Sequence, residues 1–440
     1  MFLQIKRLTW KASLIATVVS TLAFTVALAA SGDLDTTFDG DGRVTSFASP
    51  ANPGRNDVVQ GIAIQADGKI VAAGYSSIPS TATNDFAVIR YNTEGTLDAT
   101  FSGDGRLLTN FGARDQAFEV AIQANGKIIA AGQTCFGDGS ICDVALARYN
   151  VGGTLDITFS GDGKQTSDFG ANDNGSFGGL AIQSNGKIVV AGYMWNGTDY
   201  DFAVYRYLSS GSLDTTFSGD GMVNIGFGAG KQDTATDLVI QSDGKIVVTG
   251  YTGDANYANN NFAVARLNAG GSLDTTFSGD GKQTTNFGAD ESARGIAIQP
   301  DGRIVLAGIK GTGTLSSVAL ARFNIDGSLD TTFNGTGRKV FGFSGFDSWA
   351  ADVLVQSDGK ILTIGSDTLS LLGDFALVRL NSNGSFDTTF SGDGKVRVDF
   401  GDNDFGIALA IQPSDGKYVL GGVTNVGAQN NDFALARVLP

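Results

Sequence analysis

The stretch LDTTFSGDG, residues 213–221, occurs seven times in this chain with few changes. Its copies begin at Leu34, Leu97, Leu155, Leu213, Leu273, Leu329 and Phe386, at intervals of 56 to 63 residues. A regular interval of this length indicates an array of like structural units, each of which needs its neighbours to bury its apolar surface. No linker or shift in composition interrupts the array, so residues 31–440 are predicted to form one domain.

Each unit also holds four strand-like runs. In the fifth unit they cover residues 292–299, 302–309, 318–324 and 337–343, which we name strands a, b, c and d. Strands a and b are joined by Asp-Gly or Asn-Gly in every unit, and these pairs tolerate the positive φ of a tight hairpin. The runs are apolar on both faces, so each sheet is expected to lie between two others.

The ends of the array favour a closed ring over an open solenoid. The chain starts with a lone strand d at residues 42–47 and stops after strands a, b and c at residues 406–438. An open array would leave both ends incomplete, with unpaired strand edges exposed. We therefore predict an all-β, seven-bladed β-propeller with four antiparallel strands per blade, closed by residues 42–47 completing the last blade beside residues 432–438.

The repeated segments also resemble a known family. IAIQPDGRIVLAG at residues 296–308 and VALARFNIDGSLDTTFNGTG at residues 318–337 are similar to the delta-60 repeat family of bacterial β-propeller proteins. The resemblance extends over essentially the whole mature chain and implies a propeller fold and export. It implies no activity, because that family is functionally uncharacterised and the propeller fold hosts many functions.

The first 30 residues are typical of a secretory signal peptide. Lys6, Arg7 and Lys11 precede an apolar run at residues 13–26, and the small residues ALAA follow at residues 27–30. The run is short for a membrane anchor, and the sequence holds no second one. We expect residues 1–30 to be removed and the mature protein to be a secreted or periplasmic monomer.

Composition excludes several classes of function. The chain has a net charge of −15 and no histidine, so nucleic acid is not an expected partner, and histidine-based catalysis and zinc binding are unavailable. The two cysteines, Cys135 and Cys142, lie close together in the sequence. In an exported protein this spacing predicts a local disulfide.

The Gly-Asp-Gly end of the repeated phrase resembles a calcium loop, but a turn explains it better. Calcium needs six to eight oxygen ligands, whereas each turn contributes one aspartate, and the sixth copy has Thr336 in its place. Asp and Gly are the residues that tight turns require. We expect no cofactor or metal, with residues 39–42 (Asp-Gly-Asp-Gly) as the best of the poor calcium candidates.

The Leu-Asp aspartate behaves differently, because every copy keeps it. Every unit also has an arginine near the end of strand c, eight residues before that aspartate. Arg437 has no aspartate after it, and ring closure would give it Asp35. A partly buried guanidinium needs a carboxylate, so seven structural pairs are expected: Arg90–Asp98, Arg148–Asp156, Arg206–Asp214, Arg266–Asp274, Arg322–Asp330, Arg379–Asp387 and Arg437–Asp35.

Propeller geometry divides these features between two faces. The a–b turns and the c–d phrases share one face, the repeat face. The b–c and d–a loops, which differ between units, share the other, the variable face. Few basic residues fall in those loops: Arg55, Arg114, Lys231, Arg294 and Lys310. The variable face is expected to be acidic through Asp173, Asp199, Asp233, Asp254, Asp290, Glu291, Asp347, Asp402 and Asp404.

Divergent loops on a repeated frame favour a secreted binding module for a polysaccharide, a peptide or a cell-surface protein. Trp195 and Trp349 both fall in variable-face loops, and exposed aromatics often mark interaction sites. The expected ligand-binding residues are Trp195, Tyr200, Asp199 and Asp173. The alternatives are a structural, envelope-associated protein and, less favoured, a carboxylate-based glycoside hydrolase or lyase; no catalytic residue is assigned.

Overall fold

A computed structural model describes residues 29–49, 54–78, 83–137, 141–169, 178–256, 258–311, 316–343, 347–369, 372–426 and 430–440. Residues 1–28, which make up most of the expected signal peptide, lie outside this description. The described residues form 28 β-strands. None of the described segments is a helix long and apolar enough to cross a membrane.

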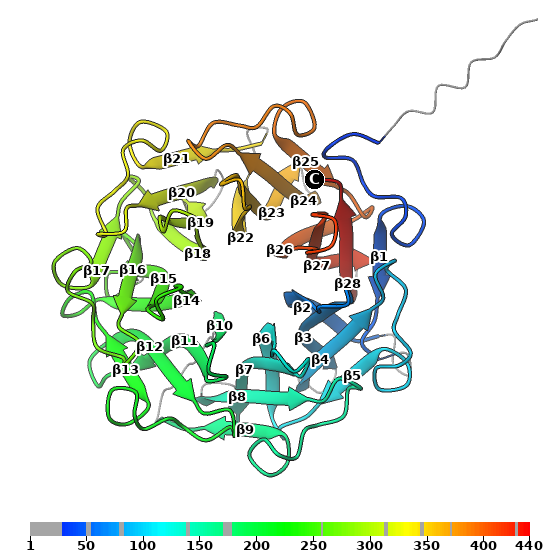
Figure 1. The fold of residues 1–440 in the computed structure, drawn as a ribbon, viewed down its shortest axis with the longest axis horizontal. Helices are drawn as coiled ribbons and strands as arrows, with labels where there is room; N and C mark the ends of the chain where they lie inside the picture. Colours follow the sequence, from blue (N-terminus) through cyan, green and yellow to red (C-terminus); the bar gives the residue numbers. More distant parts are fainter. Residues whose placement is uncertain are drawn as a thin grey trace, which may run out of the picture.

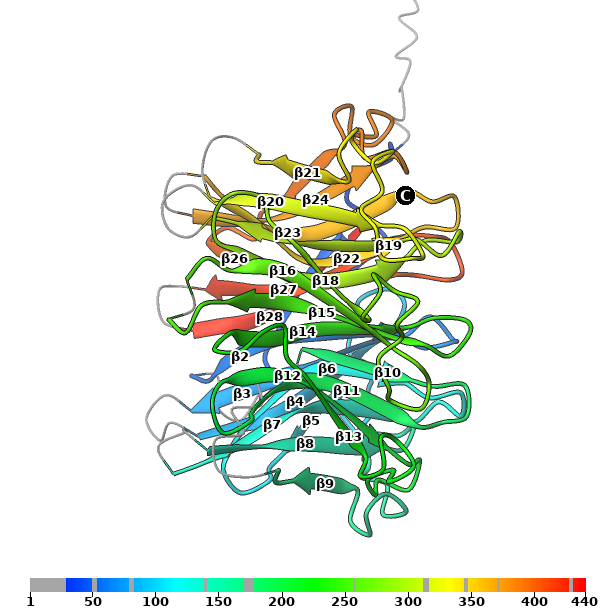
Figure 2. The same cartoon turned by 90° about the vertical axis from the view of Figure 1, so that its left-hand side faces the viewer.

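The strands form seven four-stranded antiparallel sheets around a central channel, as the sequence predicts (Figure 1). Strands a lie innermost and strands d outermost (Figure 1). Figure 2 shows the ring from the side, with the connecting loops at its two faces. We number the blades 1 to 7 along the chain.

Three blades make up the first part of the ring. Blade 1 holds β2 (Asn56–Ile64), β3 (Ile70–Ile78), β4 (Thr83–Tyr91) and β5 (Arg106–Thr109). Blade 2 holds β6 (Arg114–Ile122), β7 (Ile128–Phe136), β8 (Ile141–Tyr149) and β9 (Lys164–Ser167). Blade 3 holds β10 (Gly179–Ile182), β11 (Ile188–Trp195), β12 (Tyr200–Tyr207) and β13 (Met222–Ile225).

Four blades complete the ring. Blade 4 holds β14 (Gln232–Ile240), β15 (Ile246–Gly253), β16 (Asn261–Leu267) and β17 (Lys282–Thr285). Blade 5 holds β18 (Glu291–Ile298), β19 (Ile304–Lys310), β20 (Ser317–Phe323) and β21 (Arg338–Phe341). Blade 6 holds β22 (Ser348–Val355), β23 (Ile361–Leu369), β24 (Leu372–Leu380) and β25 (Lys395–Val398). Blade 7 holds β26 (Asn403–Ile411), β27 (Tyr418–Val426), β28 (Asn430–Val438) and β1 (Arg43–Ser46).

The predicted closure is confirmed in blade 7. The first strand, β1, pairs antiparallel with β28, with Arg43 opposite Ala436 and Ser46 opposite Phe433. Figure 1 shows β1 along the outer edge of this blade. The ring is therefore held shut by backbone hydrogen bonds between the two ends of the domain.

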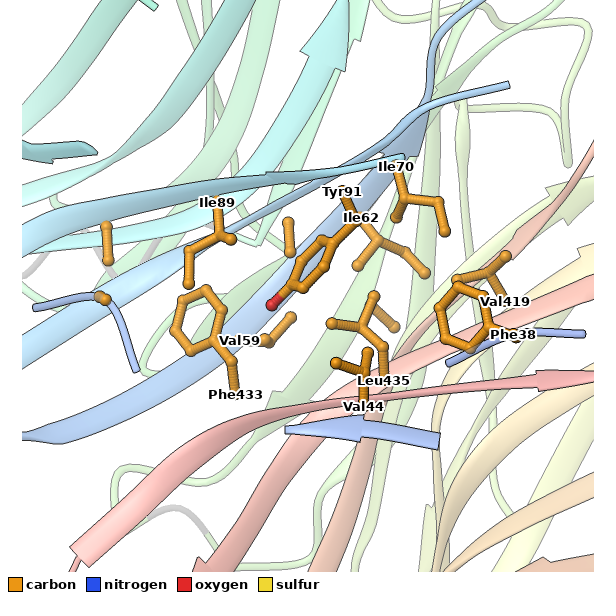
Figure 3. Packing of buried hydrophobic residues seen from close by; sticks show 14 residues of the cluster. Phe38, Val44, Val59, Ile62, Ile70, Ile89, Tyr91, Val419, Phe433 and Leu435 are labelled. Carbon is orange, nitrogen blue, oxygen red and sulfur yellow. The ribbon is translucent and has the colours of Figure 1, made fainter. Parts of the chain in front are cut away.

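The core lies between neighbouring blades, because the strands are apolar on both faces. One cluster joins Val59 and Ile62 of blade 1 to Val419 and Leu435 of blade 7, with the fully buried ring of Tyr91 among them (Figure 3). Equivalent clusters lie around the ring. Burial of apolar surface contributes roughly 25 cal/mol per Å² to the free energy of folding. Each blade is therefore stabilised by its contacts with both neighbouring blades.

A β-bulge in strand a, which the sequence does not predict, shapes the channel wall. In six blades one residue of strand a has no partner in strand b. A glycine of strand b lies beside the bulge: a Cβ added at Gly250 would lie 1.9 Å from the carbonyl oxygen of Thr234. The unpaired residues all line the channel, and they are Gln60, Phe118, Thr236, Arg294, Ala351 and Ile407.

Candidate functional site

The repeated arginines and aspartates lie in contact on the repeat face. Arg206 Nε lies 2.7 Å from Asp214 Oδ2. The other six distances between nitrogen and carboxylate oxygen are 2.7 Å for Arg90–Asp98, 2.6 Å for Arg148–Asp156, 2.7 Å for Arg266–Asp274, 2.7 Å for Arg322–Asp330, 2.8 Å for Arg379–Asp387 and 2.7 Å for Arg437–Asp35. All fourteen residues are buried.

Each aspartate also has a second basic partner that the sequence analysis missed. The residue after the a–b turn reaches across the same blade, so that Lys187 Nζ lies 2.7 Å from Asp214 Oδ2. The signal was present, because a Lys or Arg follows the turn glycine in every unit. These partners are Lys69, Lys127, Lys187, Lys245, Arg303, Lys360 and Lys417.

The same cluster also joins neighbouring blades. The guanidinium of Arg206 lies over the ring of Phe217, 4.5 Å from its centroid, and donates to the carbonyl of Ala269 in blade 4. Ser218 N–H donates to Gly270 O of blade 4 at 2.9 Å. The repeated phrase thus pins each c–d connection to the next blade, which is a structural role.

The Gly-Asp-Gly aspartates serve the turn itself. Asp220 Oδ1 accepts a 3.0 Å hydrogen bond from Met222 N–H, and Thr336 accepts the equivalent bond in the sixth copy. Gly219 and Gly221 have φ of 99° and 96°, which favour glycine. Among the described residues, three carboxylates whose oxygens lie within 4.8 Å of one another occur elsewhere, at Asp374, Asp399 and Asp404 on the variable face.

On the variable face, a polar residue near the start of strand a makes a repeated loop-capping hydrogen bond. The second residue of strand a turns back to cap the preceding loop, as when Asp233 Oδ2 accepts from Phe227 N–H at 2.7 Å. Eight of the nine carboxylates expected on an acidic surface lie among the described residues, and four of these are buried instead: Asp199, Asp233, Glu291 and Asp404. The sequence did carry a signal for this capping, because strand a begins with a pair of polar residues in six units. These pairs are residues 56–57, 114–115, 232–233, 290–291, 347–348 and 403–404.

The Trp195 loop brings together only part of the expected site. Trp195 packs edge-on against Tyr200, with ring centroids 5.2 Å apart. Asp199 is buried and accepts a 2.6 Å hydrogen bond from Gly230 N–H, so it ties this loop to the next blade. Asp173 lies outside the described residues. Asp199 is therefore placed to hold loops together, and a ligand would not reach it without opening them.

The disulfide expected from the sequence is present. Cys135 and Cys142 are bonded across the b–c connection of blade 2, between β7 and β8. The two residues face each other in the strand register, so the bond reinforces a pairing that the backbone already makes.

A cavity of about 1070 Å³ lies in the central channel. It is lined by strand a of several blades, and its walls combine aromatic, amide and carboxyl side chains. Toward the variable face it includes Tyr251, Asn260, Asp290, Asp347 and Trp349. Three further acids, which we name the waist carboxyls, stand beside the bulges: Glu119, Asp237 and Asp352.

The waist carboxyls are fixed by backbone N–H groups. Asp237 accepts from its own neighbour Leu238 at 2.7 Å and from Ile296 of the next blade at 3.0 Å. Asp352 likewise accepts from Val353 at 2.6 Å and from Leu409 of blade 7 at 2.9 Å. These two acids therefore stitch blade 4 to blade 5 and blade 6 to blade 7 at the innermost strands.

Burial raises the pKa of each waist carboxyl, and repulsion by the other acids adds to the rise for Glu119 and Asp237. The pKa of Glu119 is raised to about 8, by desolvation and then by the charge of Asp352. Desolvation raises the pKa of Asp352 to about 6. The pKa of Asp237 is also raised, by desolvation and by both other acids. Protons are therefore held in the channel at pH values where exposed carboxyls have lost theirs.

An alternation of side-chain size makes room for these acids. The residue after the bulge, with Gly179 at the equivalent position of blade 3, is from blade 1 to blade 7 Gly61, Glu119, Gly179, Asp237, Gly295, Asp352 and Ala408. A Cβ added at Gly295 would lie 2.9 Å from Asp352 Cα, and one at Gly179 would lie 3.0 Å from Asp237 Cα. Because the number of blades is odd, the alternation breaks once, between blade 7 and blade 1.

We expect thermal stability to peak near pH 4 and to fall on both sides. Glu119 and Asp352 have pKa values raised to about 8 and about 6, so the folded state binds more protons than the unfolded chain from about pH 4 upward, and stability falls as pH rises through these values. Burial opposes ionisation of Asp387, but hydrogen bonds from Thr389 and the charge of Arg379 outweigh it and lower the pKa of Asp387 to about 2. That stabilisation is lost as pH falls below about 4.

Melting temperatures measured from pH 2 to pH 9 will test this. Glu119→Gln, which cannot ionise, should flatten the decline between pH 5 and pH 8, whereas the exposed Glu94→Gln should leave it unchanged. A maximum at pH 7 or above in the unmodified protein would contradict the expectation.

A family model described as "Domain of unknown function (DUF5122) beta-propeller" matches residues 65–101, 123–159, 183–217, 241–277, 299–333, 356–390 and 414–440. Each matched segment starts at or near the a–b turn and, except for the last, ends in the repeated phrase. No curated protein matches the chain.

Several solved structures match this chain at low identity and with TM-scores below 0.5. An α-L-arabinanase of Penicillium chrysogenum complexed with arabinobiose is 12% identical, with a TM-score of 0.47, covering 90% of this chain and 97% of that one. Sqt1 from Chaetomium thermophilum is 10% identical, with a TM-score of 0.47 and coverages of 88% and 97%. The β-propeller domain of the Trilobed protease from Pyrococcus furiosus is 10% identical, with a TM-score of 0.43 and coverages of 89% and 94%. With the repeat matched in all seven units, this chain belongs to the DUF5122 β-propeller family.

Proposed function

We propose that this protein is a binding module that takes up a saccharide in its central channel from the variable face. The observation that carries the proposal is the cavity of about 1070 Å³, which is at the upper end of the usual range for ligand sites. Such a volume accommodates several sugar units. The resemblance to the delta-60 repeat family adds no activity to this proposal.

The lining combines an aromatic ring with amide and carboxyl groups, which is the combination that sugar binding uses. Trp349 lines the cavity and stacks on Phe405, with ring centroids 5.8 Å apart and an angle of 23° between the rings. This packing fixes the orientation of the indole, so little side-chain entropy would be lost on binding. The amide of Asn260 and the waist carboxyls supply the polar groups that fix the orientation of a ligand.

The proposal includes action outside the cytoplasm. The expected signal peptide and the Cys135–Cys142 disulfide both support an oxidising compartment. The divergent loops around the channel mouth would then meet soluble or surface-attached glycans directly.

We expect Trp349→Ala to weaken glycan binding by about 2 kcal/mol, the loss typical of an anchoring aromatic. Trp195→Ala is the matched control, because Trp195 belongs to the same face but does not line the cavity. A glycan array followed by calorimetry on both variants will measure the difference. Loss of binding in Trp195→Ala alone would move the site to the Trp195 and Tyr200 loop, and the absence of any glycan ligand would leave a structural role.

A second candidate is a carboxylate-based hydrolase acting in the same channel. The raised pKa of Glu119, about 8, suits a proton donor, and that of Asp352, about 6, leaves a carboxylate at neutral pH. Incubation of each bound oligosaccharide with the protein separates the two proposals. Release of shorter sugars that Glu119→Gln abolishes would favour the enzyme, and recovery of intact ligand would favour the binding module.

A further inference from the structure

We propose that the channel ligand is an anionic saccharide, of the oligouronate class, and that its carboxylate pairs with Arg294. This inference rests on the proposed function, because it assigns a charge to the ligand of the same cavity. It is carried by the position of one arginine and by the absence of a partner for it among the described residues.

Arg294 is the bulge residue of β18. It stands between Ala293 and Gly295, which both pair with β19, while Arg294 itself has no partner across the ladder. Its side chain lines the channel cavity and is exposed there. The phenol of Tyr251, which also lines the cavity, interacts electrostatically with Arg294. The guanidinium therefore lies within the cavity, with protein around it and open space before it.

No hydrogen bond or ion pair joins Arg294 to any residue in the described part of the chain. The buried arginines in that part of the chain differ from the exposed Arg294, because each of them has a carboxylate partner. Beyond the seven strand-c arginines, Arg55 is paired with Asp85 at 2.7 Å. Desolvation lowers the pKa of Arg294, which is the expected sign of a cation in protein surroundings without a counter-ion.

Six acids line the cavity, and in the described part of the chain none of them forms an ion pair with Arg294. Glu119 accepts from Val120 N–H at 3.0 Å, and Glu291 accepts from Ala289 N–H at 2.6 Å. At the mouth, Asp290 accepts from Asn260 N–H at 3.1 Å and Asp347 accepts from Ser316 N–H at 2.7 Å. Deeper in the channel, Asp237 and Asp352 are each held by two backbone N–H groups. The hydrogen bonds of these four aspartates fix them to the neighbouring blades and leave the guanidinium unpaired.

The cost of desolvation is lowered in different ways for the carboxyl groups and for the guanidinium. The waist carboxyls can take up protons, so their burial does not require a cation. An arginine cannot lose its proton in a protein, so its desolvation is relieved only by an anion or by water. A planar carboxylate fits the guanidinium fork with two parallel hydrogen bonds. In a cavity suited to sugars, a uronate supplies that group.

The test uses matched pairs of probes. Tetrasaccharides of galacturonate, mannuronate and hyaluronan will be titrated into the full mature protein by calorimetry, each beside its carboxyl-reduced, neutral counterpart. We expect at least one acidic probe to bind about tenfold or more tightly than its neutral partner, as a charged hydrogen bond predicts. Arg294→Gln should remove this preference and Arg294→Lys should retain part of it.

Controls separate the two proposals. Arg338→Gln removes the same charge from blade 5, on β21, which does not line the cavity, and it should leave the preference intact. If acidic and neutral probes bind equally, or if Arg294→Gln keeps the preference, Arg294 is merely solvated and this inference is overturned while the proposed function stands. If no probe binds, both are overturned. Unchanged melting temperatures will show that the variants fold.

Discussion

Asp214→Ala will destabilise the protein by about 3–5 kcal/mol, the loss typical of one partner removed from a buried ion pair. The carboxylate holds Arg206 and Lys187, each at 2.7 Å, and accepts from the hydroxyl of Thr216 at 2.6 Å. Without it, two cations face each other in a buried site, and the contact of Arg206 with blade 4 loses its support. Urea denaturation followed by tryptophan fluorescence will measure the change.

The matched control lies six residues further along the same phrase. Asp220 is exposed and accepts a hydrogen bond from Met222 N–H, so Asp220→Ala should cost no more than about 1 kcal/mol. Similar losses in the two variants would show that both aspartates serve only the turn. Asp214→Asn, which keeps the shape and removes the charge, should resemble Asp214→Ala if charge is the cause.

Gly250→Ala will have the second large effect, a loss of about 3 kcal/mol, at the upper end of the range for overpacking. The added methyl group would lie 1.9 Å from Thr234 O and 2.8 Å from Ala235 Cα. Both obstructing atoms belong to the backbone, so no side chain can rotate away. Either the bulge of β14 opens or the pairing of β14 with β15 breaks, and both would alter the channel wall.

Gly270 of the same blade provides the comparison. Nothing lies within 4 Å of an added Cβ there, and its φ is not in the left-handed region. Gly270→Ala should therefore be neutral, or stabilising by about 0.4–1 kcal/mol through the unfolded chain. Thermal melts of the two variants will give shifts of opposite sign or very different size. A melting temperature for Gly250→Ala equal to that of the unmodified protein would show that the bulge adapts at little cost.

The fold could be predicted because its determinants recur in the sequence. Seven copies of one phrase set the blade number, Asp-Gly and Asn-Gly set the hairpins, and the lone strand at residues 42–47 set the closure. The Arg206–Asp214 contact and its six equivalents followed from a constant spacing. Lys187 was missed although its position recurs equally, because one arginine per unit already accounts for each carboxylate.

The channel could not be predicted in the same way. A single-residue bulge does not disturb the apolar pattern of strand a, so nothing marked Arg294 as a channel residue. It lies within the predicted strand a at residues 292–299 and was nevertheless counted among the basic residues of the variable-face loops. The acids Glu119, Asp237 and Asp352 occupy a position where the other units have Gly or Ala. When the units are compared in sequence, these acids look like ordinary differences between units. In the ring they occupy equivalent positions around the channel. Asp199 was expected to face a ligand. It is buried, because its carboxylate oxygens accept hydrogen bonds from Asn196 and from Gly230 N–H within the loops.

Because β1 pairs with β28, the ring cannot close until the last strand of the domain has been synthesised. These strands are nearly the whole chain apart, so their contact has the largest loop-closure entropy in the molecule and forms after the local hairpins. Until residues 430–438 leave the ribosome, β1 has no neighbour, and the six finished blades form an open stack with two unpaired edges. Chaperone protection should therefore matter most for the nascent chain just before residues 430–438 emerge, and a truncation before residue 430 should yield an aggregating product rather than a smaller ring.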